Sequence, residues 1–408
     1  MRIVLGIFLL ISTLLLFGEP FFNEEQSGHF ADKSILPVPE PETGYSKKAI
    51  AWADSLLKKM SIDEKVGQLF MVSAYSNRDT AHEKEIADAI KNYHVGGLIF
   101  FQGGPVRQAR LTNKYQEMAK VPLYIGMDAE WGLSMRIDST VRYPKQMALG
   151  AVQNDTLIEK MGIHIAKECR RLGVHINFGP VADVNNNSAN PVINIRSFGE
   201  NKDKVVKKAI AYYKGMKKEN VMACAKHFPG HGDTETDSHI GLPVINHSKE
   251  RLDTLELFAF KKLFEAGIPS VMVGHMSIPS LDETPNLSSV FSKKIVTELM
   301  QQKMRFKGLV FTDALGMQGA LTIYERGEVE VQAFLAGNDV LLCPDSLGLA
   351  FNAMKTAVIE GRISKERLEY SVKAILLQKY TSGLYKKQPI KETNLVADLN
   401  DNKHKALA

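Results

Sequence analysis

Residues 221–243 read VMACAKHFPGHGDTETDSHIGLP, in which an apolar run, residues 221–225, gives way to a dense set of ionisable side chains. A run that is apolar throughout, without polar residues in alternation, is typical of a strand buried on both faces of a parallel sheet. Seven further runs of this kind occur along the chain, and segments with helical patterns separate them. The eight runs are residues 67–73, 95–101, 121–127, 174–178, 221–225, 270–273, 309–312 and 339–342.

The segments between these runs carry helix start and stop signals. Ser61 with Glu64, and Thr80 with Glu83, have the spacing of capping boxes. Eight alternations of strand and helix predict an α/β fold, a (β/α)8 TIM-like barrel that forms a single domain over residues 46–385. A doubly wound dinucleotide-binding sheet is disfavoured because the glycine-rich fingerprint is missing. Glycines precede five of the runs and predict the ends of helices there: Gly96, Gly173, Gly267, Gly308 and Gly337.

The composition is that of an ordinary globular protein. The 408 residues are 44% hydrophobic and 24% charged, and 51 Lys and Arg against 46 Asp and Glu give a net charge of +5. The basic residues form no dense block with aromatic residues among them, so we expect no nucleic-acid partner. The three cysteines, at positions 169, 224 and 343, have neither metal-finger nor disulfide-framework spacing and are expected to be buried thiols.

The two ends of the chain differ from this central part. Residues 1–18 hold Arg2 and a short apolar run, which predicts a signal peptide or an N-terminal membrane anchor. We therefore expect an exported protein, periplasmic or anchored in the membrane and facing the periplasm or exterior. Residues 19–45 are a polar, proline-containing spacer. Residues 386–408 are polar and are expected to bury little, as a tail or the start of a linker.

Ionisable residues follow most of the eight runs. Side chains at the carboxyl ends of barrel strands gather on one rim, which is where barrel enzymes carry their active sites. Polar groups directly after buried strands are costly unless they are paired or used. The residues in these positions are Asp128, Asp183, Arg196, Lys226, His227, His275 and Asp313.

The densest group lies in residues 226–243, and three interpretations compete for it. One is a metal site built from His227, His231, His239 and an aspartate, which is disfavoured because no H-x-H motif follows the first run. The second is acid–base chemistry, since Asp237 and His239 point to the same side of an extended segment. The third is a polar loop held together by its own hydrogen bonds.

Three residues elsewhere are ambiguous by themselves. Asp313, at the end of one run, is either a helix N-cap or a nucleophile. Asp128 is followed by Glu130 and has the same ambiguity. Arg196 follows an asparagine-rich loop, where it either binds a ligand or holds the loop by a salt bridge.

Four stretches together resemble a known family: KHFPGHGDTETDSH, NFGPVADVN, NPVINIRSFGE and FTDALGM. They are similar to the catalytic domain of glycoside hydrolase family 3, in its β-N-acetylglucosaminidase branch. The similarity runs from about residue 46 to residue 384 and covers nearly the whole predicted barrel. The string K-H-F-P-G-H-G-x4-D-S-H is the most specific part of it.

The resemblance implies a retaining exo-glycosidase that removes terminal β-linked N-acetylglucosamine from oligosaccharides such as cell-wall fragments or chitooligosaccharides. It implies that Asp313 is the nucleophile, that His239 is the acid/base and that Asp237 orients this histidine. It implies no metal and no organic cofactor. The residues expected to bind or lie near the terminal sugar are Asp128, Arg196, Lys226, His227 and His231.

Other functions stay open at this point. A broader β-glucosidase or a glycoside phosphorylase of the same family would use the same residues, and a catalytically silent barrel would bind sugar without reaction. Where many relatives read Asp-x-Glu-Gly-Gly, this chain has Trp131 in the fourth position, which bears on the aglycone preference. Longer relatives continue past the barrel into a further C-terminal domain.

Overall fold

The computed structural model describes residues 44–408, except residues 239 and 322. The predicted signal or anchor at residues 1–18 and all but the end of the spacer lie outside the described residues. Within the described part, no helix is both long enough and apolar enough to cross a membrane.

Eight parallel strands form one sheet in the order β7-β6-β5-β4-β3-β2-β1-β8, so the first and last strands are neighbours. Between β7 and β8 the sheet is joined by a single bridge, Phe311 to Val340, with the Thr312 amide donating to the Val340 carbonyl at 3.0 Å. The predicted (β/α)8 barrel is confirmed. The strands are β1 Phe70–Ala74, β2 Gly97–Phe100, β3 Tyr124–Met127, β4 Ile176–Asn177, β5 Met222–Phe228, β6 Ser270–Val273, β7 Leu309–Thr312 and β8 Leu341–Leu342.

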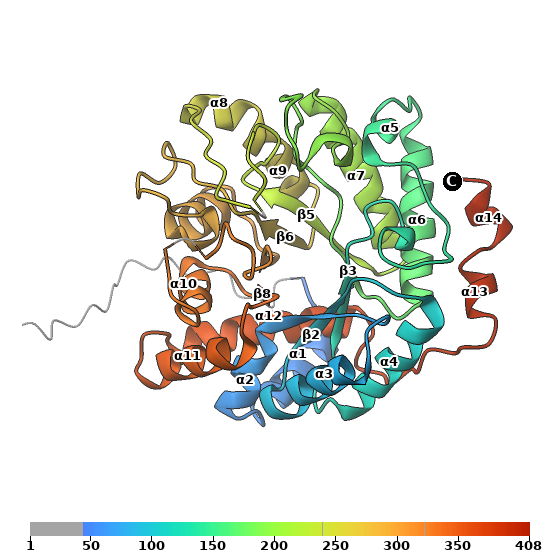
Figure 1. The fold of residues 1–408 in the computed structure, drawn as a ribbon, viewed down its shortest axis with the longest axis vertical. Coiled ribbons are helices and arrows are strands. Elements are labelled where there is room, and N and C mark those ends of the chain that lie inside the picture. Colours follow the sequence, from blue (N-terminus) through green and yellow to red (C-terminus); the bar gives the residue numbers. More distant parts are fainter. Residues whose placement is uncertain (1–43, 239, 322) are drawn as a thin grey trace, which may run out of the picture. The chain divides into compact units, whose positions relative to one another are not determined.

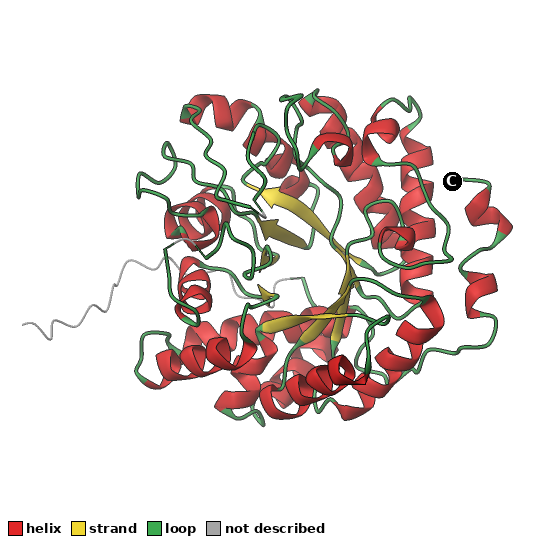
Figure 2. Ribbon diagram, viewed as in Figure 1, coloured by secondary structure: helices red, strands yellow, loops and turns green. Residues whose placement is uncertain are grey.

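Helices surround these strands (Figures 1 and 2). Two of the longest helices, α6 and α7, pack against each other on one flank of the barrel. The α-helices are α1 Lys47–Leu57, α2 Ile62–Gln68, α3 Thr80–Tyr93, α4 Pro105–Met118, α5 Gln146–Gly150, α6 Asp155–Arg171, α7 Lys202–Lys218, α8 Lys249–Thr254, α9 Glu256–Glu265, α10 Glu328–Ala336, α11 Leu347–Ile359, α12 Lys365–Thr381, α13 Leu395–Asp398 and α14 Asn402–Lys405. A π-helix, η4 Lys294–Lys303, and three 3-10 turns, η1 Leu133–Met135, η2 Asn194–Arg196 and η3 Ser289–Phe291, complete the set.

The interior of the barrel is filled by large side chains and so forms a core. Phe178 and Phe311 meet edge to face with ring centroids 5.4 Å apart, and both are fully buried. Gly126 on β3 makes room for them, because a Cβ there would lie 2.8 Å from the Phe178 ring. The packed interior leaves the carboxyl rim as the place for a site.

The boundaries of six strands differ from the sequence prediction, and for two of them, β5 and β1, the structure shows the reason. β5 continues through Lys226 and His227, which we expected in the loop after it, and its register against β6 shifts between Ala225 and Phe228. The strand continues there because Lys226 also bridges to Val181 on the other side. β1 starts later than predicted, at Phe70, because helix α2 takes up the residues to Gln68.

The helix signals are confirmed in part. Ser61 and Glu64 form the capping box predicted at the start of α2, but α3 is capped by Asp79, one residue before the predicted Thr80. Gly173, Gly267 and Gly337 have positive φ, as expected for helix ends. Before β2 and β7, non-glycine residues, His94 and Arg305, take the left-handed conformation in place of the predicted glycines.

The C-terminal residues 386–408 are not the detached tail that we expected. Leu395 is 1% exposed and Leu399 is 0% exposed, and α13 lies against α4 and α6. Arg171 on α6 binds the segment at two points: it donates to Asp398 at 2.8 Å and to the Lys391 carbonyl at 2.7 Å. Two leucines four residues apart are enough to bury one face of so short a helix.

Candidate active site

A cavity of about 450 Å³ lies at the carboxyl ends of the strands. Its lining includes both apolar and charged side chains, which come from several strands and loops. Six of the eight predicted site residues, those from Asp128 to His231 together with Asp313, lie on it. The lining residues are Ile99, Phe101, Asp128, Met135, Arg136, Val192, Arg196, Lys226, His227, His231, Ser238, Met272, Asp313, Ala314, Met317, Leu342 and Cys343.

Two carboxylates and three cations form a cluster at this cavity, and all of them except Glu130 line it. The Lys226 ammonium donates to Asp128 at 2.7 Å and lies 2.8 Å from Glu130. Arg136 donates to the other Asp128 oxygen at 2.6 Å. Arg196 holds Glu130 with two nitrogens, at 2.8 and 3.1 Å. Each buried charge therefore has a partner of opposite sign, which is the condition for keeping it ionised away from water.

These pairs determine the pKa values of the two carboxyls. Burial by itself would raise the pKa of Asp128, but Lys226 and Arg136 hold it well below its usual range. Burial opposes ionisation of Glu130 as well, and Arg196 and Lys226 lower the pKa of Glu130 to about 2. Both groups are anions at neutral pH, so they only accept hydrogen bonds. Asp128 lines the cavity, whereas Glu130 is fully buried behind the lining residues.

The low pKa of Glu130 predicts a loss of stability in acid. Because the folded pKa is about 2 and the ordinary value is 4.5, Glu130 stabilises the fold above pH 5, and this contribution is lost as the pH falls from 4.5 towards 2. We expect Glu130→Gln to lower the free energy of unfolding at pH 7 by about 3 kcal/mol, and by much less at pH 3. Urea unfolding of both proteins from pH 3 to pH 7 measures this. An equal difference across the whole range would contradict it.

Asp183 holds the two histidines of the cavity, His227 and His231, in place by hydrogen bonds. Its carboxylate is fully buried and accepts from the His227 amide at 3.1 Å, from His227 Nδ1 at 2.8 Å and from the His231 amide at 2.7 Å. A carboxylate only accepts, so His227 carries a proton on Nδ1. Its Nε2 then faces the cavity, 3.4 Å from Arg196. Burial and the neighbouring His227 lower the pKa of His231 to about 4, which keeps His231 neutral at physiological pH.

Asp313 follows β7 directly and is partly exposed to the cavity. One of its oxygens accepts from the Ala314 amide at 2.8 Å. Burial would raise the pKa of Asp313, but the neighbouring His227, His275 and Lys226 and this hydrogen bond lower it. His275 is fixed beside it by the Ala314 carbonyl at 3.1 Å and by Ser288 at 3.2 Å. Asp313 is therefore an ionised carboxylate at the cavity, in the state that a nucleophile needs.

The segment with Asp237 is a turn and not the extended strand that the sequence suggested. The Asp237 carbonyl accepts from the amides of Ile240 and Gly241 at 2.9 and 3.0 Å. The alternation argument for Asp237 and His239 therefore does not apply. His239, the predicted acid/base, lies outside the described residues. Its neighbour Ser238 lines the cavity, so this turn lies beside the site.

The two described histidines of the proposed metal set already have protein partners. His231 contacts Thr234 and Ser238 through its two ring nitrogens, and His227 contacts Asp183. Among the described residues, which leave out His239, no group of three His, Cys, Asp or Glu side chains could hold a metal ion.

Four residues join the site that were not among the predicted binding or catalytic residues. Asp183, Glu130 and His275 follow predicted strands, so the sequence could place them on the rim of the barrel. Neither their residue types nor their spacing along the chain predicted what they do there. Nothing in the sequence placed Arg136 at the site. It lies eight residues after Asp128, and the turn at η1 brings its side chain back to Asp128.

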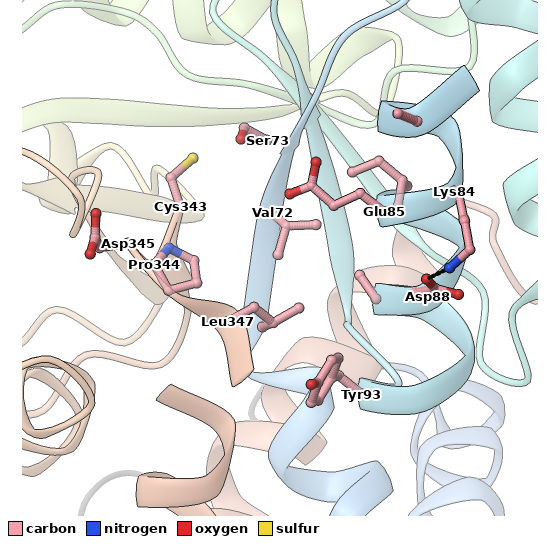
Figure 3. Close-up of a pocket in the computed structure, with 13 residues that line it drawn as sticks. Val72, Ser73, Lys84, Glu85, Asp88, Tyr93, Cys343, Pro344, Asp345 and Leu347 are labelled. Atoms are coloured by element: carbon pink, nitrogen blue, oxygen red, sulfur yellow. Dashed lines mark hydrogen bonds and ion pairs between the residues drawn. The ribbon is translucent and has the colours of Figure 1, made fainter. Parts of the chain in front are cut away.

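A second cavity of about 450 Å³ lies outside the barrel wall, between β1, α3 and the start of α11 (Figure 3). Its acidic side chains already pair with neighbours: Asp88 with Lys84, Glu85 with His82, and Asp345 with Arg326. It shares only Cys343 with the first cavity and holds none of the predicted site residues. The cavity at the strand ends is therefore the candidate active site.

Several known proteins are similar to this chain in sequence or in fold. Beta-hexosaminidase A from Pseudoalteromonas piscicida is 34% identical over 283 residues, which are 64% of this chain and 47% of that protein. The solved glycoside hydrolase family 3 beta-N-acetylglucosaminidase from Paenibacillus sp. str. FPU-7 is 33% identical, with a TM-score of 0.76 over 83% of this chain and 68% of that one. A beta-glucoside phosphorylase bound to 2FGlc is 25% identical, with a TM-score of 0.84 over 89% of this chain and 66% of that one.

The chain thus spans about half the length of the Pseudoalteromonas protein and about two thirds of each of these solved chains. The model of the glycosyl hydrolase family 3 N terminal domain matches residues 61–377, which include all eight strands and every described residue of the cavity. The chain belongs to glycosyl hydrolase family 3.

Proposed function

We propose that the protein is a retaining exo-β-N-acetylglucosaminidase. The observation that carries the proposal is Asp313, an ionised carboxylate at a cavity whose charged side chains can bind sugar hydroxyls. A sugar ring has hydroxyls that both donate and accept, and the cavity offers both partners: the Asp128 oxygens accept, and Lys226, Arg136 and Arg196 donate. The relatives named as hexosaminidases favour N-acetylglucosamine as the sugar.

In the proposed mechanism, Asp313 attacks the anomeric carbon and forms a glycosyl-enzyme intermediate, which water then hydrolyses. Retaining glycosidases usually place a second carboxyl group about 5 Å from the nucleophile as acid/base. We propose that His239, oriented by Asp237, takes this part. Lys226 and His227 lie close enough to Asp313 to lower its pKa, so they also favour its departure from the intermediate as an anion.

Phosphorolysis is the second candidate, because one of the similar solved structures is a beta-glucoside phosphorylase. A histidine acid/base repels an incoming phosphate less than a carboxylate would. Once Asp313 is esterified in the glycosyl-enzyme intermediate and carries no charge, three cations, Arg136, Arg196 and Lys226, lie beside the two remaining carboxylates of the cluster, Asp128 and Glu130. Phosphate and water would then compete for the same glycosyl-enzyme intermediate.

One assay separates these functions. We expect the purified protein to release the chromophore from an aryl β-N-acetylglucosaminide at least about tenfold faster, in kcat/KM, than from the matching β-glucoside, a difference of about 1.4 kcal/mol. Product analysis with and without added inorganic phosphate distinguishes free sugar from sugar 1-phosphate. Preference for the glucoside would overturn the substrate assignment, and a sugar 1-phosphate as the main product would favour the phosphorylase. Binding of the sugar with no release from either substrate would favour the silent barrel.

We further propose that the protein is exported and acts on peptidoglycan-derived fragments or chitooligosaccharides. The sequence of residues 1–18 supports export, because a basic residue precedes a short apolar run. Fractionation of cells that express the full chain tests the location, and retention in the cytoplasm would contradict it.

A further inference from the structure

Residues 386–408, here called the C-terminal strap, run beside α6 and α4 (Figure 1). Ile390 is fixed to α4 by two hydrogen bonds with the Asn113 side chain, at 2.8 and 2.9 Å. Its side chain fills the space beside Gly173, where a Cβ would lie 2.5 Å from it. The strap is thus docked by specific contacts along its length and does not merely lie on the surface.

The strap reaches the loop that carries part of the candidate active site directly through Asn400, and indirectly, by way of α6, through His404. This loop, the β3–α5 loop, spans residues 128–145 and supplies Asp128 and Arg136 to the cavity. Asn400 donates to the Ser139 carbonyl at 2.7 Å, and Ser139 has a φ of 58°, a conformation that serine adopts only when its surroundings hold it. His404 lies 2.8 Å from the Glu168 carboxylate on α6.

Glu168 connects His404 to the same loop. Glu168 is buried, and its Oε1 accepts from the Tyr143 hydroxyl at 2.6 Å. The Tyr143 ring lies against Gly132, where a Cβ would be 2.6 Å from the ring, and the Tyr143 amide donates to the Trp131 carbonyl at 3.3 Å. His404 and Tyr143 thus contact the same oxygen of Glu168. Glu168 holds Tyr143 in place, and the Tyr143 ring in turn packs against Gly132 of the same loop.

The two halves of the loop are held differently. Ala129 is fixed from inside the barrel, because its amide and carbonyl both bond the Asn177 side chain and its carbonyl also accepts from Tyr212. Arg136 lies in the other half, between the residues that the strap reaches. Loosening the strap should therefore disturb Arg136 and its pairing with Asp128 while leaving the start of the loop in place.

We infer that Asn400 and His404 are positioning residues, through which the C-terminal strap holds the β3–α5 loop so that Arg136 orients Asp128 for sugar binding. The part of this inference that concerns sugar binding rests on the proposed function. Neither residue lines the cavity, so their effect passes through the loop. Because they support binding without touching the reacting atoms, their loss should weaken substrate binding more than it slows the chemical step.

The test uses the full chain with Asn400→Ala and His404→Leu together, beside Lys403→Ala as the matched control, which changes an exposed residue of the same helix. Hydrogen–deuterium exchange of peptides from residues 128–145 reports on the loop without any substrate. We expect faster exchange in residues 132–143 of the double variant and no change in the control. For the glycosidase reaction we expect KM to rise about tenfold with kcat changed less than about twofold. His404→Gln, which can still donate to Glu168, should restore most of the loss caused by His404→Leu alone.

Unchanged exchange in residues 132–143 would overturn the inference, and so would exchange that rises equally throughout the barrel, because the strap would then only stabilise the fold. If the wild type releases no sugar, the proposed function fails, while the exchange experiment still decides whether the strap holds the loop.

Discussion

Replacement of Asp313 by alanine is expected to reduce kcat/KM for an aryl β-N-acetylglucosaminide by on the order of 10⁵-fold. The substitution removes the group that would form the covalent bond, and no other described carboxylate of the cavity is available, because Asp128 and Glu130 are held in ion pairs with Lys226 and two arginines. Folding should be little affected, since the side chain makes one hydrogen bond to its own neighbour, Ala314. Steady-state kinetics and thermal unfolding of the variant measure both effects.

A small external nucleophile strengthens this test. Azide fits the space left by the missing carboxylate and should restore turnover of the Asp313→Ala variant, giving a glycosyl azide of the α configuration. Asp345→Asn is the matched control, because Asp345 also follows a strand but lines the second cavity. It should retain activity within about twofold of the wild type. Near-normal activity of Asp313→Ala would show that another group, such as the acetamido group of the substrate, acts as the nucleophile.

The second large effect is expected from Asp183→Asn, a change of one atom outside the cavity surface. The 2.7 Å bond from the His231 amide requires an oxygen at the Oδ1 position, which leaves the new NH2 group facing His227 Nδ1. Two donors cannot meet there, so the His227 proton must move to Nε2, where it meets Arg196 at 3.4 Å. We expect kcat/KM to fall by on the order of 10³-fold, because the imidazole is then in the wrong tautomer beside Asp313.

Asp233→Asn provides the comparison for this variant. Asp233 lies on the same β5–α8 connection as His231 and is paired with His247 at 2.7 Å and Asn186 at 2.9 Å, away from the cavity. The kcat/KM of the Asp233→Asn variant should differ from that of the wild type by less than about twofold. The ¹⁵N chemical shifts of the His227 ring report the tautomer directly, and an unchanged Nδ1-protonated ring in Asp183→Asn would contradict the explanation whatever the activity.

The barrel could be predicted from sequence because its strongest signal is local. Each buried strand is a short apolar run, and every predicted run contains or overlaps a strand of the structure. Asp128, Lys226 and Asp313 could be placed on one rim for the same reason, since the rim collects the residues that follow the strands. Their pairing could not be predicted, because the 2.7 Å contact between Lys226 and Asp128 joins residues 98 positions apart.

Two kinds of feature gave no local signal. Arg136 reaches Asp128 through the irregular turn at η1, and no periodicity describes such a turn. The strap has only two buried leucines, Leu395 and Leu399, in a polar surrounding, so composition predicted a tail. Its docking depends on Gly173 and Asn113, whose importance appears only when distant segments are brought together.

The closure of the sheet has a consequence for biosynthesis. Phe70 on β1 pairs with Leu341 on β8, so one edge of β1 has no partner until roughly 270 further residues have left the ribosome. At about 5–20 residues per second, this edge stays open for some 15 to 50 seconds. An unpaired, apolar strand edge is a template for association with other chains. The newly made chain therefore passes through a period in which chaperones that cover such edges would determine how much of it reaches the folded state.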